Sequence, residues 1–257
     1  MLQAGIVPSW HFPIVIDFAG RQIPIHQAID LVAFAGGFQA YRWMKRRWPG
    51  PALSFEQQIW IIVGAIFGAI AGAKVLAWAE QPDFSWQAIF SQAAWVQGKT
   101  IVGGLLGGWA GVEIAKKILG INVSTGDAYV FPLLGGMAVG RVGCFLTGLA
   151  DHTHGLPSKL PWAVDYGDGL PRHPTQIYEI AFLIVIGIVL WCCRTRFQTN
   201  GVLFRTFMAC YLTMRFCIEF IKPRDVIYCG LSPIQWTCLL ATVFCLASIR
   251  RFKRTET

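Results

Sequence analysis

The chain has 257 residues, of which 54% are hydrophobic and only 14% are charged. A water-soluble domain of this length carries more charge, so the composition argues against one. The net charge of +8 would suggest nucleic-acid binding only if the basic residues formed a stripe, and here they lie in short clusters between apolar runs. The eight cysteines lie mostly in apolar segments without CxxC or Cys/His spacing, which argues against a disulfide framework. The sequence therefore predicts an integral membrane protein that binds no nucleic acid.

Apolar segments long enough to cross a membrane recur along the whole chain. A helix needs about 20 mainly apolar residues to cross roughly 30 Å of hydrocarbon. Seven such spans are predicted, at residues 26–43, 57–79, 100–119, 128–149, 175–193, 201–220 and 233–249. The run from Phe90 to Val96 is too short to cross, and we expect it to be interfacial or re-entrant. The fold class is therefore predicted to be all-α, a polytopic bundle forming a single domain over 1–257.

The ends of this arrangement differ in charge. The N-terminus lacks a basic region followed by a short apolar core, so we expect no cleaved signal peptide. Twelve basic residues follow spans one, three, five and seven, and six lie at the opposite ends. The positive-inside rule then places the N-terminus outside and the C-terminus in the cytoplasm, so that in a bacterial inner membrane the N-terminus would be periplasmic. The longest irregular segment, 150–174, would lie on the outer face.

Glycines repeat every four residues inside three of the predicted spans. In lipid, such rows let helices approach closely, because packing replaces the hydrophobic effect between them. We interpret these rows as helix contacts: Gly64, Gly68 and Gly72; Gly103, Gly107 and Gly111; Gly136 and Gly140.

Charged residues inside the spans are candidates for function, because charge in a membrane is costly. Arg215 and Glu219 are four residues apart and could pair with each other. Lys74 and Glu113 are interpreted as a structural pair, or Lys74 as a cation reaching a helix end. Arg141 has no acidic residue three or four positions away in its own helix. It must face another helix, water or an anionic ligand, and a phospholipid phosphate suits its guanidinium.

An ordered set of motifs surrounds these charges. It comprises Gly140-Arg141-Val142-Gly143 followed by Cys144, then Leu160-Pro161-Trp162, then Arg172-His173-Pro174-Thr175-Gln176-Ile177-Tyr178-Glu179, and finally Arg215 to Phe220. In order and spacing the chain resembles the prolipoprotein diacylglyceryl transferase family over almost its whole length, most closely at 140–179.

The resemblance implies a reaction and a set of site residues. Members of the family move the diacylglyceryl group of phosphatidylglycerol onto the cysteine thiol in the lipobox of a prolipoprotein, and release glycerol phosphate. The partners implied are phosphatidylglycerol, the lipobox peptide and the lipid bilayer, with no cofactor and no metal. The catalytic candidates are Arg141, Arg215, Glu219 and Cys144. The candidates for substrate binding are Gly140, Gly143, Gly103, Gly104, His173, Gln176, Tyr178 and Glu179; we expect the last four to order the outer-face loop against the site.

Four positions depart from the family pattern. Val102 stands where the family usually has a histidine before the Gly-Gly of span three. Cys144 replaces an asparagine, Leu149 replaces a glutamate, and the first span has Ile25-His26-Gln27-Ala28 where a tyrosine-glycine pair is expected. Four such changes together suggest a divergent subfamily with changed chemistry or substrate.

These departures leave alternatives open. Cys144, one turn after Arg141, could be a nucleophile or an inert buried thiol, and His26 could act as a base or be an interfacial histidine. Asp151, His152 and His154 could bind a metal with His173 or Asp165, against the simpler reading of a polar loop. The alternative functions are a transferase of the same fold with another acceptor, and a non-catalytic phospholipid-binding protein.

Overall fold

Seven long helices make up most of the chain. The computed structural model describes residues 12–18, 21–47, 51–82, 98–197 and 199–254. Its α-helices in these parts are α1 (Ile25–Arg47), α2 (Phe55–Ala79), α5 (Ile101–Ile118), α6 (Val130–Thr147), α7 (Thr175–Cys193), α8 (Val202–Ile218) and α9 (Pro233–Arg254). Each of the seven predicted segments is a helix whose ends differ from the prediction by a few residues. The predicted interfacial run at 90–96 lies outside the described residues.

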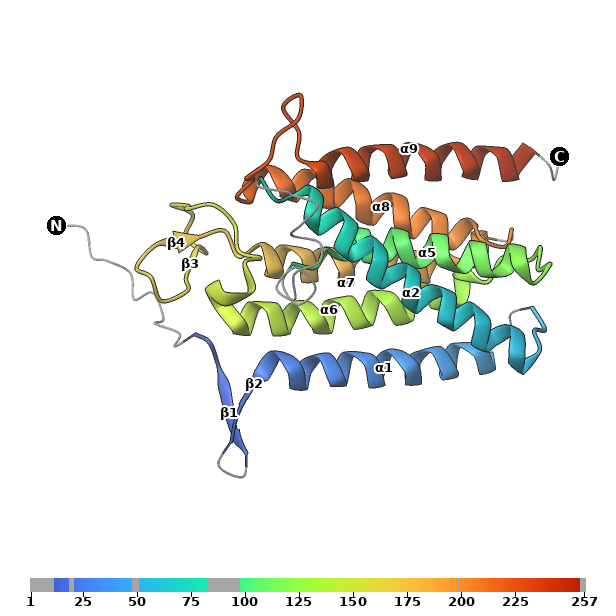
Figure 1. Ribbon diagram of the computed structural model, residues 1–257, viewed down its shortest axis with the longest axis horizontal. Helices are drawn as coiled ribbons and strands as arrows, with labels where there is room; N and C mark the ends of the chain where they lie inside the picture. Colours follow the sequence, from blue (N-terminus) through green and yellow to red (C-terminus); the bar gives the residue numbers. More distant parts are fainter. Residues whose placement is uncertain (1–11, 19–20, 48–50, 83–97, 198, 255–257) are drawn as a thin grey trace.

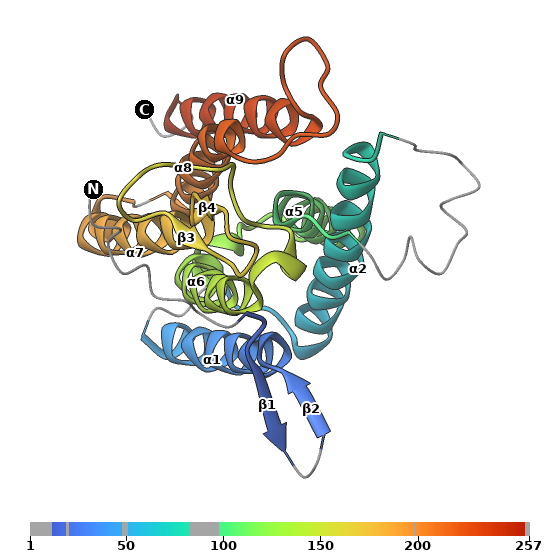
Figure 2. The same ribbon diagram turned by 90° about the vertical axis from the view of Figure 1, so that its left-hand side faces the viewer.

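The helices run side by side along the long axis of the molecule (Figure 1). α2 packs along α5, α1 and α7 pack along α6, and α9 packs along α8, as the end view in Figure 2 also shows. α8 is the most enclosed helix, with Phe207 and Tyr211 fully buried. By contrast, Phe34, Phe67 and Ile188 on the outer helices are more than half exposed. An apolar outer surface of this kind suits a protein surrounded by lipid rather than water.

Four of the helical segments are long and apolar enough to cross a membrane: Phe55–Ala79, Gly126–Asp151, Thr175–Arg196 and Pro233–Arg251. The other three fall short for local reasons. α8 and the 3₁₀ turn that follows it contain Arg205, Arg215 and Glu219, α5 contains Glu113 and two lysines, and α1 is the least apolar of the seven. The chain is therefore an all-helical membrane protein in its main architecture.

The predicted glycine contacts are found where α2 meets α5. A Cβ atom added to Gly68 would lie 2.2 Å from the carbonyl oxygen of Gly107, and one added to Gly72 would lie 2.3 Å from that of Gly103. The two backbones therefore touch directly, which only glycine permits. The prediction is wrong for the third row: a Cβ on Gly140 would meet nothing within 4 Å, and one on Gly136 would only reach van der Waals contact with Ala33.

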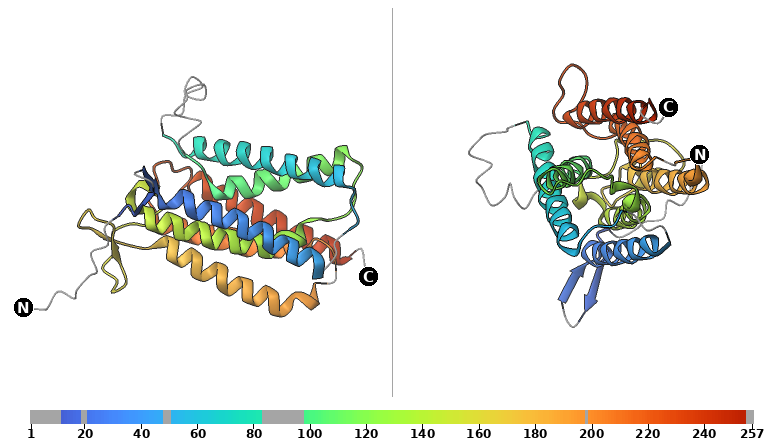
Figure 3. Two further views of the ribbon diagram at one scale, coloured as in Figure 1. Left: turned by 90° about the horizontal axis from the view of Figure 1, so that it is seen from below. Right: turned by 90° about the vertical axis from the view of Figure 1, so that its right-hand side faces the viewer.

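Two small hairpins interrupt the otherwise helical fold, and the sequence analysis missed both. β1 (Val15–Phe18) pairs antiparallel with β2 (Arg21–Pro24), and β3 (Val164–Asp165) pairs with β4 (Pro171–Arg172). They are too short to appear in a search for spans of about 20 residues. Both lie at the end of the bundle where α1 begins and α6 ends (Figure 3).

Candidate active site

A buried cluster of charges lies where α6, α7 and α8 meet. Arg141 Nη2 on α6 is 2.7 Å from Glu179 Oε2 on α7, and Arg215 Nη1 on α8 is 3.5 Å from the other oxygen, Glu179 Oε1. Arg215 Nη2 also donates a hydrogen bond of 2.8 Å to Glu219, in the 3₁₀ turn η4 (Glu219–Ile221) that follows α8. All four side chains are at least 95% buried. Arg141 and Arg215, on different helices, therefore share one carboxylate, that of Glu179.

The local fold explains this convergence. α7 begins at Thr175, directly after Pro174, and its first turn buries Thr175 and Gln176 completely. Glu179 follows one turn later on the same face, because residues four apart in a helix lie above one another. α6 and α8 both run towards this end of the bundle, so Arg141 and Arg215 arrive near their C-terminal ends. The predicted pairing of Arg215 with Glu219 is confirmed.

Lys222 belongs to the same cluster, although in the sequence it is only one of the six basic residues at the outer ends of the predicted spans. The residue is 91% buried, and its ammonium group interacts electrostatically with Arg215, Glu179 and Arg141. Burial, reinforced by the positive charge of Arg215, lowers the pKa of Lys222 to about 8. Its place three residues after Glu219, just beyond a span, could have marked it as a candidate.

The cluster holds more positive than negative charge. Arg141, Arg215 and Lys222 contribute three cations, and Glu179 and Glu219 contribute two carboxylates, which leaves an excess of one positive charge. Glu80 at the end of α2 also interacts with Arg215, but burial raises the pKa of Glu80 to about 7, so it is only partly ionised at neutral pH. A buried site with this balance suits an anion with a single negative charge.

Several buried donors in the cluster are unused. Arg141 Nε, Arg215 Nε and Arg215 Nη1 have no hydrogen-bond acceptor among the described residues, and neither does the hydroxyl of Tyr211, one turn before Arg215 on α8. The Glu179 oxygens are held by charge, since their contacts with the arginines lack hydrogen-bond alignment. Unsatisfied buried donors are costly in a folded protein, and a bound anion would satisfy them. The sequence analysis missed Tyr211, whose only signal is its spacing from Arg215.

A second group of reactive side chains lies beside Arg141. Cys144 Sγ is 3.9 Å from Arg141 Nη1 and 3.6 Å from His26 Nε2, and His26 Nε2 is 3.5 Å from Asp151 Oδ1. The sequence analysis grouped Asp151 with His152 and His154. In the described part of the chain, however, the close group of potential ligands is His26, Cys144 and Asp151, so that grouping is wrong.

The other motif residues on α7 organise the loop before it. Tyr178 Oη accepts a hydrogen bond of 2.8 Å from Trp162 Nε1 and lies 3.2 Å from His173 Nδ1. Gln176 receives a hydrogen bond of 2.9 Å from Tyr166 and donates one of 3.0 Å to Thr153. These contacts tie residues 153–178 together above the charge cluster, as expected of loop-ordering residues; their predicted contact with substrate stays a prediction.

The four candidate glycines have different surroundings. Gly103 and Gly104 face α2, and Gly143 packs against Ile29 of α1, where an added Cβ would lie 3.3 Å from the Ile29 side chain. Gly140 faces open space. Helix packing thus accounts for three of them, and their predicted role in binding substrate stays a prediction. Gly140 alone leaves room beside Arg141.

The predicted pairing of Lys74 with Glu113 is wrong, because each contacts residues near its own end of the α2–α5 pair. Lys74 Nζ donates a hydrogen bond of 2.9 Å to the carbonyl oxygen of Gly98. Glu113 pairs with Lys116 one turn later, at 3.0 Å, with half of its side chain exposed. Each charge is explained by contacts near a helix end.

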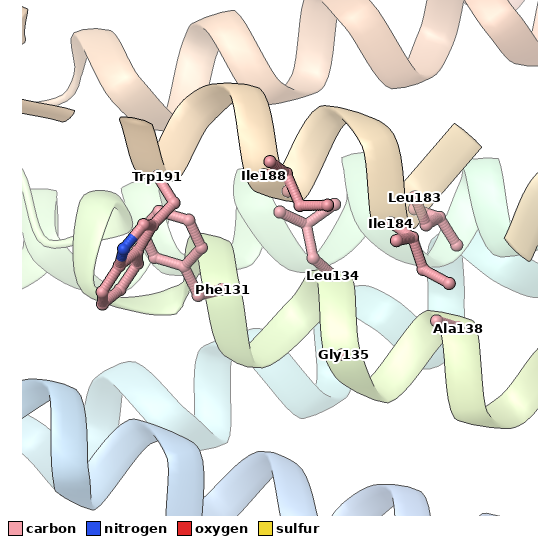
Figure 4. Close-up of a pocket in the computed structure, with 9 residues that line it drawn as sticks. Phe131, Leu134, Gly135, Ala138, Leu183, Ile184, Ile188 and Trp191 are labelled. Carbon is pink, nitrogen blue, oxygen red and sulfur yellow. The ribbon is translucent and has the colours of Figure 1, made fainter. Parts of the chain in front are cut away.

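An apolar groove of about 360 Å³ runs between α6 and α7 (Figure 4). Its walls carry no charged side chain and are formed by Phe131, Leu134, Gly135, Ala138, Leu183, Ile184, Gly187, Ile188 and Trp191. Arg141 follows Ala138 by three residues, and Glu179 precedes Leu183 by four. Residues at these spacings share a helix face, so the buried Arg141–Glu179 pair lies about one turn beyond the end of the groove on both helices.

Comparison with known proteins places these features in a family. The family described as "Prolipoprotein diacylglyceryl transferase" matches residues 13–250. The phosphatidylglycerol–prolipoprotein diacylglyceryl transferase of Bordetella avium is 26% identical over 238 residues, which are 88% of this chain and 89% of that protein. The protein with the same name from Nitratidesulfovibrio vulgaris (strain Miyazaki F) is 31% identical over 229 residues, 83% of this chain and 81% of that protein. With nearly its whole length matched, the chain belongs to the prolipoprotein diacylglyceryl transferase family.

Proposed function

We propose that this protein transfers the diacylglyceryl group of phosphatidylglycerol to the cysteine thiol of a prolipoprotein. The observation that carries the proposal is the buried charge cluster around Arg141 and Arg215, with its excess of one positive charge and its unused donors. The phosphodiester of phosphatidylglycerol carries one negative charge and offers several acceptor oxygens, so it matches both properties. The names of the relatives point to the same donor and acceptor.

The reaction requires stabilisation of the negative charge that develops on the leaving phosphate. The acceptor thiol loses its proton, the sulfur attacks the glyceryl carbon, and the carbon–oxygen bond to the phosphate breaks with its electron pair on oxygen. Glycerol phosphate leaves with one more negative charge than the diester had. Arg141 and Arg215 would hold the phosphate and offset this new charge, in a site where water does not screen them. Glu179 and Glu219 would orient the two guanidinium groups.

The groove between α6 and α7 supports a lipid donor. It is apolar along its length, it opens on the outer surface of the bundle, and its helix faces lead to the charged pair. An acyl chain lying in the groove would bring the attached phosphate to Arg141. Gly140, which has no neighbour within 4 Å of an added Cβ, would leave space for the headgroup.

The membrane arrangement that fits this function has seven spans. The helices that end in basic clusters, α1, α5 and α9, all run in the same direction along the bundle, and α7 runs with them towards Arg194 and Arg196. With that end in the cytoplasm, the segment 150–174 covers the charge cluster on the periplasmic face of a bacterial inner membrane. The lipobox of a translocated prolipoprotein would reach the site from this face.

Complementation tests the proposal. Cells depleted of their own diacylglyceryl transferase should regain growth and lipid-modified lipoproteins when they express this chain, and should not with Arg215→Ala at equal expression. Failure of well-expressed wild-type protein would overturn the proposal. Purified protein that binds phosphatidylglycerol but modifies no lipobox peptide would then indicate the non-catalytic alternative, and release of glycerol phosphate with another thiol or hydroxyl compound would indicate a different acceptor.

A further inference from the structure

Three side chains from three different elements bring metal-binding atoms together at the periplasmic end of the bundle. His26 lies in the first turn of α1, Cys144 in the last turn of α6, and Asp151 at the end of the 3₁₀ turn η2 (Gly148–Asp151). The imidazole Nε2, the thiol Sγ and a carboxylate oxygen all lie within 4.8 Å of one another. Nitrogen, sulfur and oxygen donors in one such group are the ligands that zinc accepts.

We propose that His26, Cys144 and Asp151 form a zinc site whose fourth position takes the thiol of the acceptor cysteine. In a tetrahedral zinc site, Zn–N and Zn–S bonds of ordinary length place the nitrogen and sulfur about 3.6 Å apart, and the nitrogen and oxygen about 3.4 Å apart. Here His26 Nε2 lies 3.6 Å from Cys144 Sγ and 3.5 Å from Asp151 Oδ1. Two edges of such a tetrahedron are therefore already formed, and the third, between Cys144 Sγ and an Asp151 oxygen, is no longer than 4.8 Å.

One tautomer of His26 is suited to metal binding. His26 Nδ1 lies 3.0 Å from Asp30 Oδ2, so an Nδ1–H group can donate to that carboxylate and leave the Nε2 lone pair for a metal. His26 Nε2 in turn faces Asp151 Oδ1. The 3.5 Å separation is also longer than a good N–H···O hydrogen bond. A metal ion satisfies both atoms at their present spacing.

Two of the three ligands, His26 and Asp151, are oriented by neighbouring residues, as metal ligands usually are. Asp30 orients the His26 ring through Nδ1. Thr153 donates a hydrogen bond of 2.6 Å to Asp151 Oδ2, which leaves Oδ1 facing His26. Gln176, fully buried at the start of α7, in turn donates to the Thr153 hydroxyl. The family motif on α7 is thus connected to Asp151 through hydrogen bonds.

The charges around the group fit a divalent cation. Cys144 as a thiolate, Asp151 and Asp30 supply three negative charges, so bound Zn²⁺ leaves one in excess. Arg141, with Nη1 at 3.9 Å from the sulfur, is the positive group beside them, and its own charge is shared with Glu179 at 2.7 Å. His26 and Asp151 are 27% and 18% exposed, so the site is open to solvent from the periplasmic end.

The role of the metal rests on the proposed function. A thiol that coordinates zinc loses its proton, so the acceptor cysteine would be held as a thiolate close to Arg141 and the donor phosphate. The proton passes to solvent water, and the thiolate then displaces glycerol phosphate from the glyceryl carbon. This would replace the histidine that the family usually has at the position of Val102, which is 99% buried and carries no ionisable group. Cys144 is then a zinc ligand, not the attacking nucleophile.

Metal binding can be measured without turnover. The purified chain in nanodiscs is stripped with a chelator and dialysed against Zn²⁺, and bound metal is counted by inductively coupled plasma mass spectrometry. We expect one zinc per chain, and with Co²⁺ a sulfur-to-cobalt charge-transfer band with the visible absorption of a tetrahedral site. Cys144→Ser should abolish the charge-transfer band, and His26→Gln should remove stoichiometric binding. Asp30→Asn should weaken the affinity for zinc by about 10–100-fold, the usual effect of removing a residue that hydrogen-bonds to a metal ligand.

Matched controls separate the site from other thiols and imidazoles. Cys217→Ser changes an exposed cysteine of α8, and His152→Asn changes the exposed histidine next to Asp151. Both should bind zinc as the wild type does, and all variants should keep the wild-type melting temperature in their metal-free form. The metal site would be overturned if the wild type bound no stoichiometric zinc. It would also be overturned if Cys144→Ser and His26→Gln bound zinc as well as the wild type does.

The metal site and the proposed function can fail separately. If zinc binds to these residues but neither form of the protein modifies a lipobox peptide, the site stands and the transferase proposal fails. If the metal-free protein transfers diacylglyceryl groups at the wild-type rate, the transferase stands and activation of the acceptor thiol by zinc is overturned. If zinc restores the activity of stripped wild type but not of Cys144→Ser, both are supported.

Discussion

Arg141 and Glu179 form an ion pair of 2.7 Å that joins α6 to α7 at the end of the groove between these helices. The apolar groove and the charged pair lie on the same two helix faces, so a lipid could place its chain in one and its phosphate at the other. Five predictions test this arrangement and the fold that supports it.

Arg141→Lys keeps the positive charge but loses the planar guanidinium. We expect the rate of diacylglyceryl transfer to fall about 10²–10³-fold, the usual cost of one donor to developing negative charge. The measurement is release of glycerol phosphate from phosphatidylglycerol with a lipobox peptide. Arg205→Lys, on the far end of α8, is the matched control. A similar rate in both variants would show that Arg141 does not bind the reacting phosphate.

Glu179→Gln leaves Arg141 and Arg215 without their shared carboxylate. Removing one member of a buried ion pair destabilises a protein by about 3–5 kcal/mol, and thermal unfolding in detergent should show the loss. Glu113→Gln breaks a pair whose carboxylate is half exposed, and there we expect a change below about 1 kcal/mol. Equal melting temperatures for the two variants would contradict the structural role of Glu179.

Gly187→Leu should fill the groove without disturbing the fold. A Cβ at Gly187 meets only the Leu134 side chain, at 3.7 Å, so the larger side chain would extend along the groove. We expect the KM for phosphatidylglycerol to rise about tenfold, which corresponds to about 1.4 kcal/mol of lost binding, with little change in kcat. Gly36→Leu adds the same side chain to the exposed face of α1, where nothing lies within 4 Å, and should leave KM unchanged.

Gly68→Ala should destabilise the α2–α5 pair, because the new methyl group would lie 2.2 Å from the Gly107 oxygen. Overpacking of this kind costs about 1–3 kcal/mol. Gly36→Ala, which places the same methyl group in open space, should be neutral or slightly stabilising. Melting temperatures of the two purified variants distinguish the outcomes, and an unchanged value for Gly68→Ala would mean that the helices do not touch there.

Lys222 gives the site a dependence on pH. Since the pKa of Lys222 is lowered to about 8, its ammonium loses its proton as pH rises above 8, and affinity for the anionic lipid should fall there. Stability changes in the opposite direction: between about pH 8 and 10.5 the unfolded chain binds more protons than the folded one, so the free energy of unfolding rises with pH.

Lys222→Arg keeps the charge across this range and should remove the loss of lipid affinity above pH 8. Lys159→Arg, at an exposed position in the outer loop, should retain the wild-type profile. Binding of phosphatidylglycerol measured from pH 6 to about pH 10 is the test. A profile for Lys222→Arg identical to that of the wild type would assign the pH dependence to another group.

The helices could be predicted because their signal is local. Each consists of about 20 apolar residues bounded by charge or proline, and the glycine rows on α2 and α5 repeat with the helix period. The partner of Arg141 could be predicted only as a class, since Glu179 lies on another helix and no spacing connects them. Lys222 and Tyr211 were missed because their importance comes from burial beside that pair.

The His26–Cys144–Asp151 group could not be predicted for a related reason. Metal motifs are recognised by short spacings, and these residues belong to α1, α6 and η2. The grouping of Asp151 with His152 and His154 followed sequence proximity, but adjacent residues in a tight turn point in different directions. Packing of α1 against α6, which brings Gly143 within reach of His26, decides the outcome.

The glycine contact between α2 and α5 also has a mechanical consequence. Six glycines interlock backbone with backbone, so sliding one helix along the other by less than a full repeat would drive a side chain into a carbonyl oxygen. The pair is fixed in register and behaves as one stiff wall of the bundle. Any widening that admits a two-chain lipid is then expected between α6 and α7, which meet through side chains, including the Phe131 and Trp191 rings and the Arg141–Glu179 ion pair, and have the apolar groove between them.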